Sequence, residues 1–98
     1  LADTYYTYYM QQQENGKKVK KKVCFAYVYE NEGACLVLAR LDTSYVKELN
    51  ENNKSITLSR FPKSKTEDWY SIVANDTFTD DEIYEIMENA KKYCEKEN

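Results

Sequence analysis

Basic side chains gather in two stretches of this sequence, and their chemistry suits contacts with phosphate groups. Five lysines fall between residues 17 and 22, and a second basic stretch runs from residue 60 to residue 65. Phosphate contacts need mobile positive charge at the surface. A solvated edge strand and a solvated loop would explain the same charges without any ligand. The candidate nucleic-acid-binding residues are Lys17, Lys18, Lys20, Lys22, Arg60, Lys63 and Lys65.

Two aromatic residues accompany the second basic stretch. Phe61 directly follows Arg60, and Trp69 begins an apolar segment a few residues later. Aromatic rings stack on nucleic-acid bases with little sequence preference, so both rings are candidate stacking residues or anchors, and a tyrosine beside the basic residues could stack in the same way. A simpler interpretation makes Trp69 an anchor in the core or on a half-buried sheet face. The guanidinium of Arg60 would then cover Trp69 or Phe61.

Residue types that support catalysis or metal binding are few. The chain has no histidine, no Gly-rich phosphate loop and no nucleophile beside an evident base. We therefore expect a binding domain without enzymatic activity, cofactor or resident metal. Capping of a helix explains the one acidic cluster more simply than a weak divalent-cation site does. That cluster consists of Asp76, Asp80, Asp81 and Glu82.

Composition predicts one small domain over residues 1–98. With 42% hydrophobic residues, the chain can fill a single core. A net charge of −3 argues against a uniformly basic nucleic-acid binder, yet the charge is uneven. Residues 1–40 carry six Lys and Arg against four Asp and Glu. Any anion-binding face must therefore use this part of the chain together with residues 60–65.

The cysteines and the hydropathy of the sequence indicate in which cellular compartment to expect the protein. The cysteines Cys24, Cys35 and Cys94 are odd in number and lack CxxC spacing, which disfavours a disulfide framework or a zinc site. We expect free thiols and a reducing, cytoplasmic compartment. No stretch approaches the roughly 18 apolar residues of a membrane span, and no signal peptide is visible. The chain begins at Leu1 and not at methionine, which suits a fragment or one domain of a longer protein.

Residues 1–41 predict strands joined by tight turns. The Tyr-rich opening segment favours a strand, although Tyr5, Tyr8 and Tyr9 also have helical spacing. An Asn-Gly turn at residues 15–16 and a turn ending at Gly33 follow, and the apolar residues 34–41 predict a central strand. Between the turns, alternation predicts one face formed by Lys18, Lys20, Lys22, Cys24, Ala26 and Val28, and another formed by Val19, Lys21, Val23, Phe25, Tyr27 and Tyr29.

The remaining residues predict two strands and two helices. An N-cap cluster at residues 42–44 precedes a short helix, and residues 56–60 and 69–75 suggest strands. A capping box formed by Thr79 and Glu82 predicts the start of the last helix. Its apolar stripe is Ile83, Ile86, Met87, Ala90 and Cys94. The predicted fold class is α+β, with an antiparallel sheet of about four to five strands, a short helix after the central hairpin and a C-terminal amphipathic helix packed on the sheet.

Five features follow one another along roughly residues 19–95: Phe25-Ala26, Thr43-Ser44, Ser59-Arg60, Trp69 and the run from Thr79 to Tyr84. Their order resembles the MmcQ/YjbR-like proteins, whose double-wing fold is related to the amino-terminal domain of TfoX. Members usually begin with a helix, which has no clear counterpart before the Tyr-rich segment. The resemblance implies a largely uncharacterised bacterial family of binding proteins with DNA as the expected partner.

A second interpretation uses the Tyr-rich opening segment. The rings of Tyr5, Tyr6, Tyr8 and Tyr9 combine apolar area with hydroxyl groups, a combination that suits interfaces. They predict a protein-protein interaction or dimerisation domain as the alternative to DNA binding. Self-association of the isolated chain would favour this interpretation, whereas salt-sensitive binding to DNA would favour the first.

Overall fold

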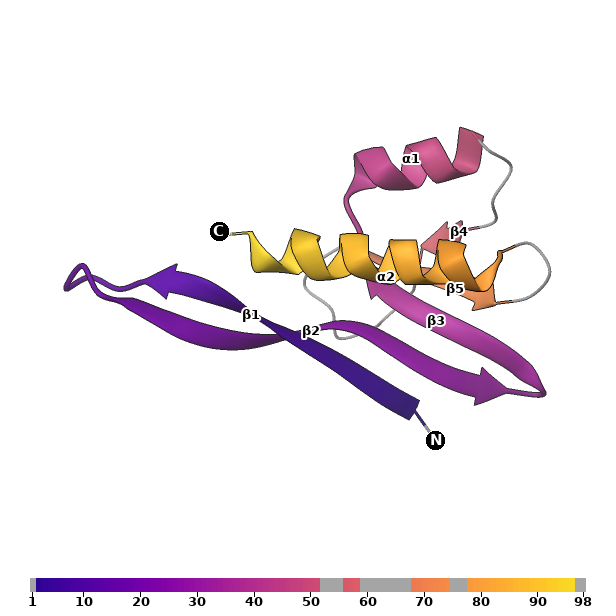
Figure 1. The fold of residues 1–98 in the computed structure, drawn as a ribbon, viewed down its shortest axis with the longest axis horizontal. Helices are drawn as coiled ribbons and strands as arrows, with labels where there is room; N and C mark the ends of the chain where they lie inside the picture. The colour runs from indigo at the N-terminus through magenta and orange to yellow at the C-terminus, as the bar shows by residue number, and fades with distance from the viewer. Residues whose placement is uncertain (1, 52–55, 59–67, 75–77, 97–98) are drawn as a thin grey trace.

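The computed structural model describes residues 2–51, 56–58, 68–74 and 78–96 of the chain. Within these ranges, five strands form one antiparallel sheet in the order β1-β2-β3-β5-β4, and α2 lies across one face of it (Figure 1). This arrangement confirms the predicted α+β fold. The elements are β1 (Ala2–Gln12), β2 (Lys18–Asn31), β3 (Ala34–Arg40), α1 (Thr43–Glu51), β4 (Ile56–Leu58), β5 (Trp69–Ala74) and α2 (Asp80–Glu95).

The Tyr-rich segment is strand β1, so the strand prediction is confirmed and the helical alternative is wrong. Residues 13–17 join it to β2. The amide of Gln13 donates to the carbonyl of Lys17 at 2.8 Å, and the amide of Gly16 donates to the carbonyl of Gln13 at 3.0 Å. The backbone of Gly16 has a φ of 83°, a left-handed conformation that glycine adopts without steric cost. The predicted Asn-Gly turn is thus confirmed.

Strand β2 contains a β-bulge that alternation did not predict. In the β1–β2 ladder, Tyr6 pairs with Cys24, whereas the neighbouring Tyr5 pairs with Ala26. The intervening residue, Phe25, is therefore an extra residue on β2. Such an insertion bends the strand and increases its local twist. The buried ring of Phe25 lies 6.3 Å from the ring of Tyr5, measured between centroids.

The bulge changes which side chains of β2 face α2. The side chain of Ala26 is fully buried in the core and Val28 packs against that core, whereas the ring of Tyr27 meets Trp69 on the opposite face. Before the bulge, Val23 also packs against the core beneath α2. The expectations that Ala26 and Val28 share the lysine face, and that Tyr27 shares the face of Val23, are therefore wrong. Successive side chains of a strand point to opposite faces, so one extra residue moves every side chain after it to the other face.

The core lies between the sheet and α2. Strand β3 pairs with β2 on one side and β5 on the other, which confirms its predicted central place. Side chains of adjacent strands, including Val37 and Ile72, pack against Ile86 and Ala90 of α2. Each of these four side chains is at most 1% exposed. Removal of this apolar area from water is the main force that holds the helix on the sheet.

Both helices begin as their sequences predict. At the start of α2, the hydroxyl of Thr79 accepts from the amide of Glu82 at 3.2 Å, and the Glu82 carboxylate accepts from the amide of Thr79 at 3.0 Å. The capping box thus uses one carboxylate of the acidic cluster. At the start of α1, the carboxylate of Asp42 accepts from the amide of Ser44 at 3.0 Å. The side chain of Val46 is the buried contact of this short helix.

Candidate nucleic-acid interface

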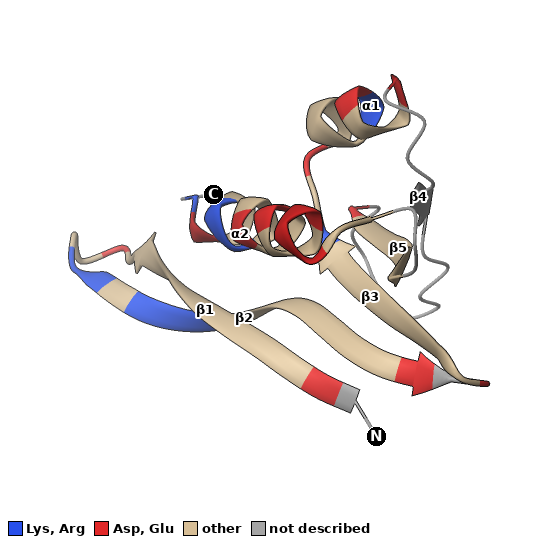
Figure 2. Cartoon of the chain, turned by 45° about the vertical axis from the view of Figure 1, so that its right-hand side comes forward, with Lys and Arg blue, Asp and Glu red and all other residues tan. Residues whose placement is uncertain are grey.

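The outer part of the β1–β2 hairpin, residues 6–24, projects beyond the carboxyl end of α2, and we call it the arm (Figure 1). It carries five lysines and one glutamate, although the whole chain has a net charge of −3. All five lysine side chains are exposed. Figure 2 shows their positions along the outer half of β2. The structure therefore separates a basic projection from an acidic remainder.

One face of the arm combines tyrosines of β1 with lysines of β2. Directly paired residues of an antiparallel ladder point to the same side of the sheet, and Tyr8 pairs with Lys22 while Met10 pairs with Lys20. On this face the side chains of Tyr6, Tyr8 and Met10 are 50%, 49% and 42% exposed. We call it the Tyr/Lys face, and it consists of Tyr6, Tyr8, Met10, Lys18, Lys20 and Lys22.

The lysines of this face lie over tyrosine rings diagonally across the ladder. The Nζ atom of Lys20 is 4.6 Å from the ring centroid of Tyr8, and that of Lys22 is 4.1 Å from the ring centroid of Tyr6. At exposed sites a cation–π pair contributes about 0.5–1 kcal/mol. Such a contact orients the ammonium group without neutralising its charge. The face therefore presents ordered aromatic rings and positive charge together.

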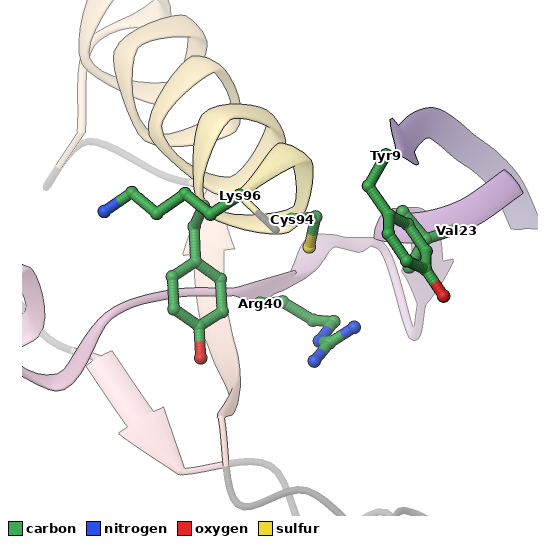
Figure 3. A pocket seen from close by; sticks show the side chains of 6 residues that line it. Tyr9, Val23, Arg40, Cys94 and Lys96 are labelled. Atoms are coloured by element: carbon green, nitrogen blue, oxygen red, sulfur yellow. The ribbon is translucent and has the colours of Figure 1, made fainter. Parts of the chain in front are cut away.

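The other face of the arm is attached to α2 near its base. The hydroxyl of Thr7 donates to a carboxylate oxygen of Glu95 at 2.5 Å, and the Thr7 side chain is buried. Further along, Tyr9 and Val23 line a cavity of about 170 Å³ together with Cys94 of α2 (Figure 3). These contacts fix the direction in which the arm leaves the rest of the domain.

The same cavity contains a charged cluster that already has its partners. The guanidinium of Arg40 donates to the carboxylate of Asp68 through Nη2 at 2.8 Å and through Nε at 3.2 Å. The hydroxyl of Tyr93 donates to the same carboxylate at 2.8 Å. The charge of Arg40 is therefore neutralised within this cluster. The cluster ties β3, the start of β5 and α2 together.

Burial also lowers the acidity of Tyr93 in this cluster and of the neighbouring Cys94. It raises the pKa of Tyr93 to about 12, with the hydrogen bond to Asp68 as the next cause. Burial likewise raises the pKa of the Cys94 thiol to about 11, whereas the nearby charge of Arg40 opposes that change. A thiol that stays protonated at neutral pH is a weak nucleophile. Cys94 is therefore a packing residue of this cavity.

The sequence-predicted site residues are only partly brought together. The first basic stretch, residues 17–22, lies on the arm. Trp69 begins β5, where it is half-buried with its ring centroid 5.4 Å from that of Tyr27, as expected for a sheet anchor. The other predicted residues, Arg60, Phe61, Lys63 and Lys65, lie outside the described residues, as does Asp76 of the acidic cluster.

Sequence reasoning placed the candidate DNA site on the lysines, with a tyrosine beside them as a candidate stacking residue, and the alternative protein-interaction site on the Tyr-rich segment. The structure places these tyrosines and lysines on one surface. The signal was present in the sequence, because a turn at Asn15-Gly16 brings the lysine run opposite the Tyr-rich segment. The cluster of Arg40, Asp68 and Tyr93 was also missed. No local motif links these three residues, which are 25 residues or more apart in the chain.

Neither a metal site nor a membrane helix is found in the part of the chain that the structure describes. Its Cys, Asp and Glu side chains form no group of three or more that could hold a metal ion. Its helices are too short or too polar to cross a membrane. Comparisons with protein-family models, with curated protein sequences and with solved structures found no match. The resemblance to MmcQ/YjbR-like proteins therefore stays a prediction.

Proposed function

We propose that this chain is a non-enzymatic domain that binds nucleic acid through the arm, with DNA as the expected partner. The observation that carries the proposal is the concentration of five exposed lysines on a projecting hairpin. Such side chains gain affinity by releasing counterions from phosphates. The resemblance to MmcQ/YjbR-like proteins adds DNA by analogy. The free thiols of Cys24, Cys35 and Cys94 suit a reducing compartment such as the cytoplasm.

The dimensions of the arm suit a groove of duplex DNA. Residues 6–12 of β1 extend about 24 Å at about 3.4 Å per residue. The major groove is about 12 Å wide and about 8.5 Å deep, and it admits a two-stranded β-ribbon. The arm is therefore long enough to reach the floor of the groove while its lysines contact the flanking phosphates.

A salt titration of binding to a short DNA duplex tests the proposal. Affinity should fall steeply with salt, and Lys20→Gln should weaken binding and reduce the log–log salt slope by about one. The matched control is Lys47→Gln, which removes the same charge from an exposed position on α1. The proposal fails if neither the duplex nor a single strand of equal length binds at low salt, or if the two variants weaken binding equally.

A second candidate function, self-association, is favoured by the exposed edge of the sheet. The hydrogen bond between Gln13 and Lys17 marks these residues as a hydrogen-bonded pair of the antiparallel ladder. Because hydrogen-bonded and non-hydrogen-bonded pairs alternate along the ladder, the backbone groups of Tyr6, Tyr8 and Met10 point away from β2. From residue 4 to residue 12, β1 has no charged side chain, and charge is a common device against edge pairing. Antiparallel pairing with β1 of a second copy would use this edge.

Sedimentation at several concentrations tests this second candidate. Met10→Pro would remove an outward-pointing donor while the donors toward β2 stay in place. If β1 pairs between copies, the wild-type chain should sediment as a dimer and the Met10→Pro variant as a monomer. Lys20→Gln serves as the control that should leave the mass unchanged. A wild-type chain that stays monomeric at every concentration would contradict self-association.

A further inference from the structure

We infer that the Tyr/Lys face binds single-stranded nucleic acid, with bases stacked on Tyr6 and Tyr8 and phosphates held by Lys20 and Lys22. This inference rests on the proposed function and specifies its ligand. The rings of Tyr6 and Tyr8 are half-exposed, whereas tyrosine rings normally bury most of their apolar area. Here the rings of Tyr6 and Tyr8 form a contiguous exposed patch with Met10, and such patches mark interaction sites.

The spacing of the rings distinguishes single strands from duplexes. Two side chains on the same face of a strand, two residues apart, are separated by about 6.8 Å. Successive bases in duplex DNA rise by about 3.4 Å and stack on one another. A base can therefore occupy each ring only if the nucleic acid is stretched and its bases are unpaired. Aromatic platforms of this kind bind successive bases of single strands.

A lysine that could contact a phosphate of the bound nucleic acid lies over each of these two tyrosine rings. The Nζ atoms of Lys22 and Lys20 lie over the rings of Tyr6 and Tyr8. On binding, each ammonium group would move to a phosphate while a base takes its place over the ring. An exposed cation–π contact is weaker than a base–aromatic stack, so this exchange favours the bound state.

The surroundings of the face also favour a negatively charged strand. A shallow groove of about 530 Å³ runs along it and is lined in part by Lys20 of the arm and Lys91 of α2. The acidic residue of this groove, Glu95, accepts the hydrogen bond from Thr7 and is held toward the base of the arm. A nucleic-acid strand that extends from the rings of Tyr6 and Tyr8 toward α2 would therefore meet a further lysine, Lys91.

Fluorescence anisotropy with a labelled oligodeoxythymidine and a labelled duplex of equal length tests this inference at low salt. The single strand should bind more tightly than the duplex. Both Tyr6→Leu and Tyr8→Leu should weaken binding of the single strand about tenfold and leave binding of the duplex unchanged, since a lost stack removes a base contact. The Tyr6→Phe and Tyr8→Phe variants keep a ring and should bind like the wild type.

The control variant is Tyr84→Leu, which replaces a tyrosine of α2 that is 71% exposed and should change neither affinity. Circular dichroism should show that every variant is folded. If the duplex binds as tightly as the single strand, or if the leucine variants bind normally, this inference is overturned while the proposed function stands. If neither oligonucleotide binds at the lowest salt, both are overturned.

Discussion

Strand β2 passes through two different environments, and the bulge at Phe25 is the boundary between them. Beyond it, Ala26 is buried in the body, by which we mean residues 25–31 together with β3, β5 and α2. Before it, the lysines and their tyrosine neighbours on the arm are exposed. The body gains stability from burial, whereas the arm is held mainly by its ladder, its turn and the contacts of Thr7 and Val23. One strand therefore combines a buried part with an exposed basic part.

The largest expected difference between body and arm concerns core packing. Because Ile86 is only 1% exposed and packs against the sheet, Ile86→Ala should lower the free energy of unfolding by about 2–5 kcal/mol. The matched change on the arm, Val19→Ala, affects a half-buried side chain and should cost less than about 1 kcal/mol. Urea denaturation followed by circular dichroism measures both. Equal losses would show that the arm belongs to the same core.

A smaller difference should appear at alkaline pH. The pKa of Tyr93 is about 12 in the folded chain and about 10 in an unfolded chain. Below pH 10 the hydroxyl is protonated in both states, so its full contribution is present. Between pH 10 and pH 12 the unfolded chain loses this proton first, and the stability of the fold falls as pH rises.

The variant Tyr93→Phe lacks this ionisation, so its stability should fall less steeply between pH 10 and pH 12 than that of the wild type. The urea midpoint as a function of pH measures the effect. The control is Tyr84→Phe, which changes an exposed tyrosine and should follow the wild-type curve. Identical curves for all three proteins would show that Tyr93 is not held by the body.

The smallest expected effect concerns the two turns. Both Gly16 and Gly33 have positive φ and open space where a Cβ would lie, so alanine would introduce backbone strain of about 1 kcal/mol without a steric clash. Hydrogen exchange should be accelerated in the arm for Gly16→Ala and near the β2–β3 turn for Gly33→Ala. If Gly16→Ala accelerates exchange throughout the core, arm and body open as one unit.

Much of the fold could be predicted because its signals are local. The Asn-Gly turn, the capping box of Thr79 and Glu82, and the apolar stripe of α2 each depend on residues within a few turns of one another. The bulge could not be predicted, because alternation contains no mark that an extra residue has entered the ladder. The assignment of Ala26, Val28 and Tyr27 to faces failed for that reason.

The candidate site, too, could be predicted from the sequence only in part. The sequence alone determined that the lysine run is basic, exposed and opposite a Tyr-rich segment, since charge and turn chemistry are properties of short stretches. Only the tertiary structure decided that lysines and tyrosines share one face and that Arg40, Asp68 and Tyr93 meet around one carboxylate. These arrangements depend on strand register and on packing between distant elements. Both are set by burial of the whole core, to which every element contributes.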